Sequence, residues 1–439
     1  MQAKTKLKLK NKKSKILLQT PKGMRDILPS EEKWYDRIYK VFREVVEFYG
    51  FKKITTPILE YADIFKRGVG EETDIIEKEM YILKTKGGDL LALRPEGTTP
   101  ILRAYFENNL DKLPQPQKLY YFGPFFRHEN PQAGRLRQFY QLGYEILGKK
   151  SDPLYDAEAI VLAVDLLKEL KISNFIVNLN SIGCQTCRPK YIKKLEEYYK
   201  KNSAYICKDC ARRIKTNPLR VLDCKNEICE PIKKEAPNIL DSLCSSCRDH
   251  FKNVLEYLDE LNIPYSLNPT LVRGLDYYSK TVFEFGIEGI GSEIGSLGGG
   301  GRYDYLAENF NKGILPSLGA ALGVERLIYV MKAQQIKLPE RQGKKVFIIH
   351  LGDLAKKKTL LIMQQLRQAG IAFVETQEKE SLKAQLRQAN KTQADLALII
   401  GQKEVFDRTI IIRDMRSGLQ ETVPLNKLTE SVKKYIKNI

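Results

Sequence analysis

GPFFRHENPQAGRLRQFYQLGYEILG, residues Gly123–Gly148, is the stretch of sequence that decides the fold. Lys118–Phe126 is rich in aromatic residues and Arg137–Leu147 alternates between two faces, so both segments are predicted to be β-strands. Asn130–Gly134 lies between them and has the composition of a turn. The sequence therefore predicts a β-hairpin with a long polar tip.

Polar side chains on this hairpin indicate a sheet that faces a ligand. Arg127 ends the first predicted strand, and Gln141 and Glu145 lie on one face of the second. A sheet face that presents these groups together costs stability unless they meet a ligand or one another. The pattern leaves two interpretations open, a binding site and a solvated face whose charges pair.

The whole chain has the size and composition of a globular protein with two or three domains. It contains 439 residues, of which 43% are hydrophobic, and no apolar run is long enough to span a membrane. The first residues are rich in lysine rather than apolar, so no secretory signal is visible. We therefore expect a cytoplasmic protein without a membrane partner.

The formal net charge of +19 suggests a polyanionic partner, with nucleic acid as the first candidate. Seven lysines and no acidic residue lie within residues 1–19, and this composition predicts a disordered basic tail. The alternative is a charge excess that serves solubility alone.

The cysteines are confined to one segment of the chain. Residues 184–262 are lysine-rich, helical in pattern and flanked by strand-rich sequence, so we expect an insertion domain. Two Cys-x-x-Cys pairs provide the ligands of one tetrahedral zinc site, and eight cysteines are enough for two. The spacing does not decide which pairs combine, and a reduced, metal-free module is the alternative. The candidate zinc ligands are Cys184, Cys187, Cys207, Cys210, Cys224, Cys229, Cys244 and Cys247.

Arg94–Pro100 forms a turn between a predicted strand and a predicted helix. We expect Thr98 or Thr99 to cap this helix and Pro100 to be its first residue. Glu96 then lies at the mouth of the turn, a position where binding groups often lie. The alternative is that its carboxylate only complements the helix dipole.

A glycine-rich stretch, Gly298–Gly301, allows the backbone to approach a ligand or another strand closely. The sequence lacks a Gly-Lys-Ser/Thr phosphate loop, so a nucleotide site would have to lie on antiparallel sheet. Gly319–Lys332 is predicted to form a helix that places Arg326 two turns from its start. An arginine there is either a phosphate ligand or a solvated charge.

The pattern changes after a charged linker that begins at Leu338. Strands and helices alternate through residues 343–439, which predicts a compact α/β domain. This domain shows no catalytic constellation, so we interpret it as a binding module.

Several stretches together resemble the bacterial histidyl-tRNA synthetases, a family of class II aminoacyl-tRNA synthetases. They follow the family's order and spacing from about Thr20 to the C-terminus. The stretches are Pro21–Asp26, Leu93–Thr98, Gly123–Gly148, Leu271–Tyr278, Gly300–Asp304 and Gly323–Leu327.

The resemblance implies an α+β fold in which helices flank the antiparallel sheet of a class II catalytic domain. This domain would span residues 20–337 and contain the helical insertion at 184–262. An α/β anticodon-binding domain would occupy residues 343–439. The family also implies a homodimer that meets around Pro57, whereas zinc is not implied by family membership.

The implied reaction joins histidine to its tRNA. Histidine and ATP, accompanied by Mg²⁺, form histidyl-adenylate and pyrophosphate, and histidine is then transferred to the terminal ribose of the tRNA. By resemblance, Arg127 and Arg273 hold the α-phosphate and Arg326 holds the γ-phosphate. Glu145 and Tyr278 would read the two imidazole nitrogens. The residues implied to bind histidine are Glu96, Thr98, Gln141, Glu145, Tyr277, Tyr278 and Tyr303.

The hairpin tip is implied to meet the acceptor end of the tRNA through Gln132 and Arg137. Asn130 stands where a basic residue is usual in the family, so one phosphate contact of the tip is in question while the activation step is not. Two alternatives come from other classes of protein. A non-catalytic paralogue, such as the regulatory subunit of ATP phosphoribosyltransferase, is expected to lack the anticodon-binding domain and parts of the active site. A general RNA-binding protein would explain the charge but not the combination of Arg, Glu and Gln.

Overall fold

The computed structural model describes residues 18–70, 73, 75–132, 134–289, 294–339, 345–375 and 381–438. The basic tail predicted for residues 1–19 lies outside this range except for its last two residues. The chain divides into two compact units, Met1–Leu338 and Pro339–Ile439. Within the described ranges, no helix is both long enough and apolar enough to cross a lipid bilayer.

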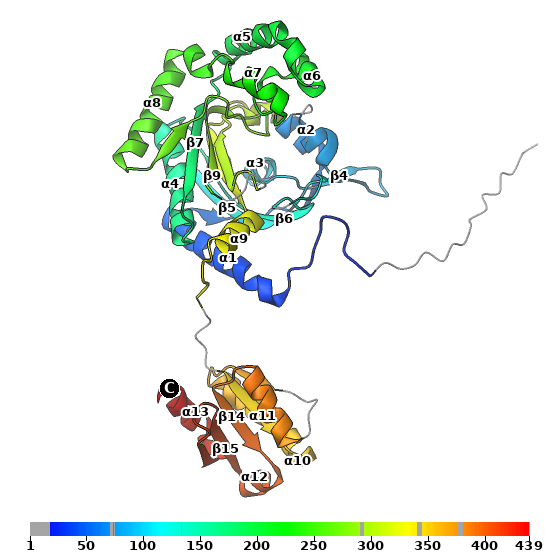
Figure 1. Cartoon of the computed structure of the whole chain (residues 1–439), viewed down its shortest axis with the longest axis vertical. Coiled ribbons are helices and arrows are strands. Elements are labelled where there is room, and N and C mark those ends of the chain that lie inside the picture. The colour runs from blue at the N-terminus through cyan, green and yellow to red at the C-terminus, as the bar shows by residue number, and fades with distance from the viewer. Residues whose placement is uncertain are drawn as a thin grey trace, which may run out of the picture. The chain divides into compact units, whose positions relative to one another are not determined.

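An eight-stranded sheet forms the centre of the first unit (Figure 1). In spatial order its strands are β1 (Lys52–Lys53), β5 (Gln117–Phe126), β6 (Gln138–Leu147), β11 (Ser317–Gly323), β10 (Gly298–Arg302), β9 (Ser279–Ile287), β7 (Phe175–Ser181) and β8 (Tyr265–Leu267). Only the two outer pairs, β1 with β5 and β7 with β8, are parallel among these strands. The predicted sheet, mainly antiparallel and flanked by helices, is confirmed.

The hairpin predicted from the central stretch of sequence is also confirmed. β5 and β6 pair antiparallel along their whole length, with Gly123 opposite Gln141. On its other edge β6 pairs with β11, and this register places Glu145 opposite Gly319. Successive residues of β6 point to opposite faces of the sheet, so one face of the hairpin can be apolar and the other polar.

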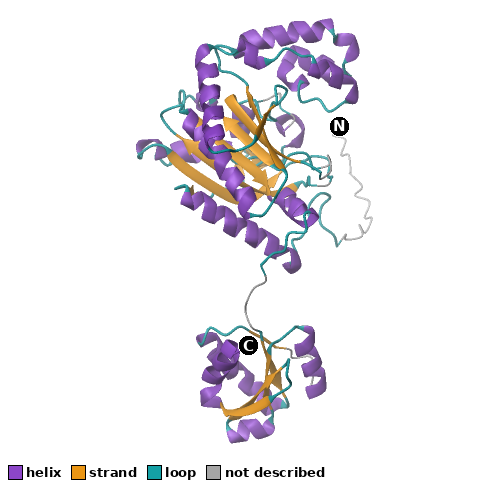
Figure 2. Cartoon of the chain, turned by 60° about the vertical axis from the view of Figure 1, so that its left-hand side comes forward, coloured by secondary structure: helices purple, strands orange, loops and turns teal. Residues whose placement is uncertain are grey.

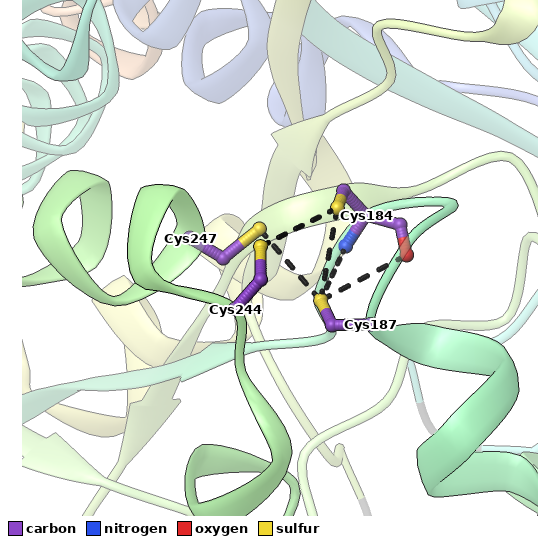
Figure 3. Close-up of side chains that lie close together, drawn as sticks. All are labelled: Cys184, Cys187, Cys244 and Cys247. Atoms are coloured by element: carbon purple, nitrogen blue, oxygen red, sulfur yellow. Dashed lines mark hydrogen bonds between the residues drawn. The ribbon is translucent and has the colours of Figure 1, made fainter.

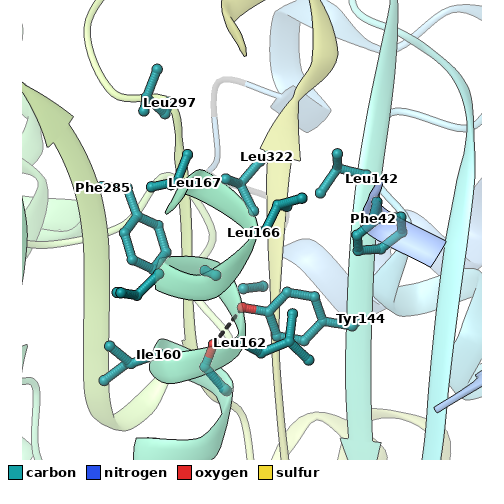
Figure 4. Close-up of a cluster of buried hydrophobic side chains, with 14 of the residues drawn as sticks. Phe42, Leu142, Tyr144, Ile160, Leu162, Leu166, Leu167, Phe285, Leu297 and Leu322 are labelled. Atoms are coloured by element: carbon teal, nitrogen blue, oxygen red, sulfur yellow. Dashed lines mark hydrogen bonds between the residues drawn. The ribbon is translucent and has the colours of Figure 1, made fainter. Parts of the chain in front are cut away.

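Helices cover one face of the sheet and build the main hydrophobic core with it (Figure 4). Tyr144 of β6 lies in this core, and its hydroxyl donates a hydrogen bond of 2.5 Å to the carbonyl of Ala159. The helices are α1 (Pro29–Phe48), α4 (Pro153–Glu169), α8 (Ser245–Glu260) and α9 (Val324–Ala333). Buried core side chains include Phe42, Leu142, Ile160, Leu162, Leu166, Leu167, Phe285, Leu297 and Leu322.

The helix predicted at Gly319–Lys332 is wrong in its first part. Its first residues belong to β11, and α9 begins only at Val324. A glycine is required in the strand because a Cβ at Gly319 would lie 1.6 Å from the Oε2 atom of Glu145. Arg326 consequently lies in the first turn of α9 and not two turns from the start of a helix.

The glycine-rich stretch Gly298–Gly301 forms β10 with Arg302, between β9 and β11. A Cβ at Gly299 would lie 2.4 Å from the carbonyl oxygen of Phe283 and 2.9 Å from the guanidinium of Arg273. The expectation of a close approach is therefore confirmed, and the absent side chain leaves room for Arg273 directly on the sheet.

The rest of the first unit surrounds the sheet. A small three-stranded sheet has the order β2-β4-β3, with β2 at Leu59–Tyr61, β3 at Ile82–Lys84 and β4 at Leu90–Leu93. Two helices lie near it in sequence, α2 (Ala62–Val69) and α3 (Thr98–Glu107). Residues 184–262 are mainly helical, with α5 (Arg188–Lys201), α6 (Lys208–Thr216), α7 (Glu230–Lys234) and α8.

The second unit is a five-stranded mixed sheet with helices packed on both faces (Figure 2). In spatial order the strands are β13 (Phe373–Glu375), β12 (Val346–His350), β14 (Leu396–Ile400), β15 (Thr409–Asp414) and β16 (Gln420–Pro424). The helices are α10 (Asp353–Gln368), α11 (Leu382–Lys391), α12 (Gln402–Asp407) and α13 (Leu428–Asn438). The predicted α/β pattern is confirmed, with α12 as an additional short helix.

Candidate active site

A cavity of about 150 Å³ opens over the polar side of the hairpin. Its lining combines β6, β10 and β11 with the hairpin tip, the turn before α3 and the loop before β9. Eight of the ten residues named for activation line it: Glu96, Thr98, Arg127, Gln141, Arg273, Tyr277, Tyr278 and Arg326. The other two, Glu145 and Tyr303, are buried and bonded to each other. Residues far apart in the sequence are therefore brought to one place.

The three predicted arginines come from three different elements. Arg127 follows β5, and its Nε donates to the carbonyl of Pro95 at 2.9 Å. Arg326 donates from Nη1 to a carbonyl of the loop before β10 at 2.5 Å. Arg273 forms an ion pair with Glu284. Among the described residues, Arg273 is the only one of the three that forms an ion pair. Arg127 and Arg326 donate to carbonyl oxygens, which do not neutralise the positive charge of these two arginines.

Arg135 also lines the cavity and was missed from the sequence. Burial, together with the positive charges of Arg135 and Arg127, lowers the pKa of Arg326 to about 10. The ion pair of Arg135 with Glu129 is long, at 3.8 Å. The Nε atoms of Arg135 and Arg273 are buried and have no hydrogen-bond partner within the part of the chain that the structure describes. This end of the cavity therefore carries a surplus of positive charge and unused donors, which suits an anionic ligand. The several arginines close together in the sequence of the hairpin tip could have indicated that Arg135 belongs to the site.

Glu96 caps the helix that follows it. Its carboxylate oxygens accept hydrogen bonds from the backbone N–H groups of Thr98 at 2.7 Å and Thr99 at 2.9 Å. The expectation that a threonine caps this helix is wrong, because α3 already begins at Thr98. Burial raises the pKa of Glu96. The same carboxylate complements the helix and lines the cavity, so the two interpretations do not exclude each other.

Glu145 lies at the base of the site and is almost fully buried. Its Oε2 accepts a hydrogen bond of 2.6 Å from the Tyr303 hydroxyl, and its Oε1 accepts one of 2.8 Å from the Thr98 hydroxyl. Desolvation raises the pKa of Glu145 to about 8, although the hydrogen bonds from Tyr303 and Thr98 oppose this shift. Such a carboxyl group is a specific acceptor or donor rather than a solvated charge.

Aromatic rings form the walls beside Glu145. The ring centroids of Tyr277 and Tyr278 are 4.8 Å apart, and those of Tyr277 and Tyr303 are 5.6 Å apart. Tyr121 packs over Gly143 so closely that a Cβ there would lie 2.3 Å from its ring. Aromatic rings that carry hydroxyl groups therefore lie beside Glu145, and such surroundings suit a small ring with polar edges.

The residues predicted for the tRNA acceptor end lie apart from the cavity lining. Asn130 and Gln132 are exposed at the hairpin tip. The backbone N–H of Arg137 donates to Gly23 at 2.7 Å, and its Nε donates to the carbonyl of Glu129 at 3.1 Å. The role of these residues toward tRNA stays a prediction.

Comparison with known proteins agrees with this architecture. Residues 23–327 match the histidyl-tRNA synthetase family, and residues 345–435 match the anticodon binding domain. The histidine–tRNA ligase of Halothermothrix orenii is 43% identical over 419 residues, which are 95% of this chain and 100% of that protein. The ligase of Desulfitobacterium hafniense is 44% identical over 424 residues, covering 96% of this chain and 99% of that protein. The crystal structure of apo S. aureus histidyl-tRNA synthetase is 32% identical with a TM-score of 0.79, covering 94% and 99% of the two chains.

The antiparallel sheet, its cavity and the separate α/β unit, together with these relatives, define an aminoacyl-tRNA ligase. Within that class, the chain belongs to the histidyl-tRNA synthetase family. The resemblance drawn from the sequence motifs is confirmed.

Proposed function

We propose that this chain activates L-histidine with ATP to histidyl-adenylate and transfers the histidine to the histidine tRNA. The observation that carries the proposal is the division of one site into two ends. Arg326, whose side chain lies beside Gly323 of β11, makes a cationic end together with Arg127 and Arg135, and the buried carboxyl group of Glu145 lies beside Gly319 of the same strand. Phosphates suit the first end and an imidazole suits the second. The curated relatives named histidine–tRNA ligase support the same conclusion.

The phosphate end would act by positioning and by neutralising charge. Adenylation is an in-line displacement, in which the histidine carboxylate attacks the α-phosphorus and pyrophosphate leaves. Arg127 and Arg273 would bind the α-phosphate oxygens and Arg326 the γ-phosphate, as the resemblance implies. Arg135, whose charge acts on Arg326, would join the γ-phosphate end.

The histidine end would recognise each polar group of the substrate. Glu145 and Tyr278 would contact the two ring nitrogens. Glu96 and Thr98 would hold the amino group, and Gln141 would lie near the carboxylate. A buried carboxyl group and hydroxyl that need partners discriminate strongly against side chains without ring nitrogens.

Tyr277 and Tyr303 would line the histidine pocket. Both rings are buried, so they exclude water from the reacting groups. The Tyr303 hydroxyl also fixes one oxygen of Glu145. We therefore assign Tyr303 a positioning role besides its contact with the substrate ring.

Mg²⁺ would accompany ATP and be held largely by its phosphates. Glu129 fits as a protein ligand because its side chain lines the cavity and its ion pair with Arg135 is long. The distance between the Oε2 atom of Glu129 and the Nη1 atom of Arg135 is 3.8 Å. Glu325 also lines the cavity, but both its oxygens accept from the Tyr140 backbone N–H at 3.0 Å. We also propose structural Zn²⁺ in the cysteine-rich segment, without a part in adenylation.

The tRNA would be bound at two places. We propose residues 20–337 as the catalytic domain, with the insertion at 184–262, and residues 343–439 as the anticodon-binding domain. Gln132 and Arg137 would contact the acceptor end from the hairpin tip. The net charge of +19 suits so large a polyanion.

We further propose that the enzyme is a homodimer in the cytoplasm. The region around Pro57 exposes several large apolar side chains, and contiguous patches of this kind mark interfaces. These exposed residues are Ile58, Leu59, Tyr61, Ile82, Leu83 and Leu90.

A non-catalytic paralogue is the weaker alternative. The structure titled an ATP phosphoribosyltransferase regulatory subunit/histidyl-tRNA synthetase from Bacillus halodurans C is 21% identical, with a TM-score of 0.62. Identity at this level supports a common fold alone. The anticodon-binding match and the eight candidate activation residues that line the cavity favour the ligase.

Charging of a histidine tRNA transcript with labelled histidine tests the proposal. We expect charging that depends on ATP and does not occur with an alanine tRNA transcript. A folded protein that leaves the histidine transcript uncharged would overturn the proposed function.

A further inference from the structure

Two clusters of four cysteines lie in the insertion, and each brings its sulfur atoms together. The outer cluster is Cys184, Cys187, Cys244 and Cys247 (Figure 3), and the inner cluster is Cys207, Cys210, Cys224 and Cys229. Within each cluster the sulfur atoms all lie within 4.8 Å of one another. The sequence left the pairing of the cysteines open, and the structure shows that it is nested in sequence order. The first and last cysteine pairs form one cluster, and the two pairs between them in the sequence form the other.

The sulfur–sulfur distances of the outer cluster match a tetrahedron around one metal ion. The Sγ atom of Cys184 lies 3.7 Å from that of Cys187 and 3.8 Å from that of Cys244. The Sγ atoms of Cys187 and Cys247 are 3.8 Å apart. Four sulfurs that each lie ~2.3 Å from a central zinc are about 3.8 Å from one another. A disulfide needs about 2.0 Å, and all eight cysteines are free.

The inner cluster has the same geometry. The Sγ atoms of Cys207 and Cys224 are 3.8 Å apart. Backbone N–H groups hold the sulfurs in both clusters, from Cys207 to the Cys229 sulfur at 3.2 Å and from Cys184 to the Cys187 sulfur at 3.2 Å. Such contacts orient metal ligands in established sites, so the sulfurs are arranged before a metal binds.

The outer cluster is tied to the histidine end of the active site. Arg188 directly follows Cys187, and its Nη2 donates to the carbonyl of Tyr278. Its Nε donates to the carbonyl of Ile182 at 3.1 Å, in the segment that leads from β7 to Cys184. One arginine thus joins the start of α5, the end of β7 and the loop that carries Tyr278.

The inner cluster is tied to the same loop by a second arginine. Arg220 lies four residues before Cys224, and its Nη2 donates to the carboxylate of Asp276 at 2.9 Å and to the carbonyl of Gly274 at 2.8 Å. Both acceptors lie between Arg273 and Tyr278. The loop from Arg273 to Tyr278 is therefore held from two sides by segments that the cysteine clusters organise.

We infer that each cluster binds one Zn²⁺, and that the two ions together position the loop Arg273–Tyr278. The inference rests on the proposed function in so far as this loop binds histidine and ATP. Without the ions, the segments that bear Arg188 and Arg220 lose their cross-links, and the loop loses its supports. Zinc then acts on substrate binding through position and takes no part in the chemical step.

Zinc content of the full-length protein tests the sites without any activity assay. We expect two zinc ions per chain in the wild type and a tetrathiolate absorption spectrum after replacement by Co²⁺. Folded wild-type protein that is essentially zinc-free, or a Co²⁺ spectrum without thiolate ligation, would overturn the inference.

Paired substitutions test the nested arrangement. Cys184→Ser with Cys244→Ser removes two ligands from one cluster and should leave one zinc ion. Cys184→Ser with Cys207→Ser removes a ligand from each cluster and should leave none. The control Ser246→Ala, an exposed residue between two ligands, should keep both ions. Equal zinc loss in the two double variants would contradict the pairing.

Kinetics of Arg220→Gln tests the positioning role. The variant should keep two zinc ions, raise the KM for histidine about tenfold, a change of ~1.4 kcal/mol, and leave kcat nearly unchanged. Arg212→Gln, an exposed arginine of α6, is the matched control and should leave KM unchanged. An unchanged KM in Arg220→Gln would refute the positioning role. Wild-type protein with two zinc ions but no histidine activation would instead refute the proposed function and leave the metal sites standing.

Discussion

The carboxyl group of Glu145 accepts a hydrogen bond of 2.6 Å from the hydroxyl of Tyr303. Thr98 bonds the other oxygen at 2.8 Å, so both oxygens are fixed before a substrate arrives. β6 supplies Glu145, and the segment directly after β10 supplies Tyr303. A group held in place by its neighbours costs less entropy on binding and discriminates better than a mobile one.

Replacing Glu145 with glutamine should change how stability depends on pH. The folded pKa of Glu145 is about 8, above the ordinary 4.5, so the folded chain keeps a proton that the unfolded chain loses. The contribution of this group to the free energy of unfolding therefore falls as pH rises from about 4.5 toward 8. Thermal unfolding at pH 5.5 and pH 8 should show Glu145→Gln gaining stability relative to the wild type at the higher pH. The same difference at both pH values would contradict the raised pKa.

Tyr303→Phe should weaken histidine binding in a pH-dependent way. The hydrogen bond from Tyr303 lowers the pKa of Glu145, so its loss raises that pKa further and leaves less carboxylate near neutral pH. We expect the KM for histidine to rise about tenfold at pH 7 and less at pH 9. Tyr329→Phe is the control, because this tyrosine is 40% exposed. A KM ratio between variant and wild type that is independent of pH would argue against the pKa effect.

Arg326→Met should weaken ATP binding while changing the stability of the fold only slightly. Burial and neighbouring arginines hold the pKa of Arg326 at about 10, below the ordinary 12.5, so its charged form is disfavoured in the folded chain. Removing the charge should raise the KM for ATP about 10- to 100-fold and shift the melting temperature by only about 3 °C. Arg43→Met, an exposed residue of α1, is the control for loss of one charge. Strong destabilisation without a change in ATP binding would contradict the assignment.

Arg273→Ala should abolish most of the activation step while the fold survives. Its guanidinium lies over Gly299, where a Cβ would be 2.9 Å from its Nη1 atom. We expect histidine-dependent pyrophosphate exchange to fall about 100-fold or more, the usual effect of losing one preorganised donor. Near-normal exchange would refute the role of Arg273, and Lys252→Ala on the exposed side of α8 should leave exchange unchanged.

Much of the fold could be predicted because the hairpin follows local rules. The alternation in β6 fixes which residues face the core and which face the cavity, and the α/β order of the second unit follows from short apolar strands between helices. The helix prediction for the segment at Gly319 was wrong because Gly, Ala and Leu are compatible with a helix when the segment is considered alone. Its strand conformation is set by Glu145 and by the glycines of β10, both distant in sequence.

The sequence named individual candidate site residues but not the hydrogen bonds between them. Family motifs named Arg127, Glu145 and Arg326, but the hydrogen bonds that tie Glu96 to α3 and Glu145 to Tyr303 depend on tertiary contacts. The nested pairing of the cysteines depends on where α8 returns to the end of β7. The spacing of cysteines in the sequence does not show which distant segments lie together in the fold.

Histidine-dependent exchange between ATP and labelled pyrophosphate is the most direct test of the proposed activation of histidine, because it needs the whole cavity and no tRNA. We expect exchange with histidine and none with the other standard amino acids. Labelled pyrophosphate should enter ATP only when histidine is present. Folded, full-length protein that catalyses no exchange with histidine would contradict the proposed function.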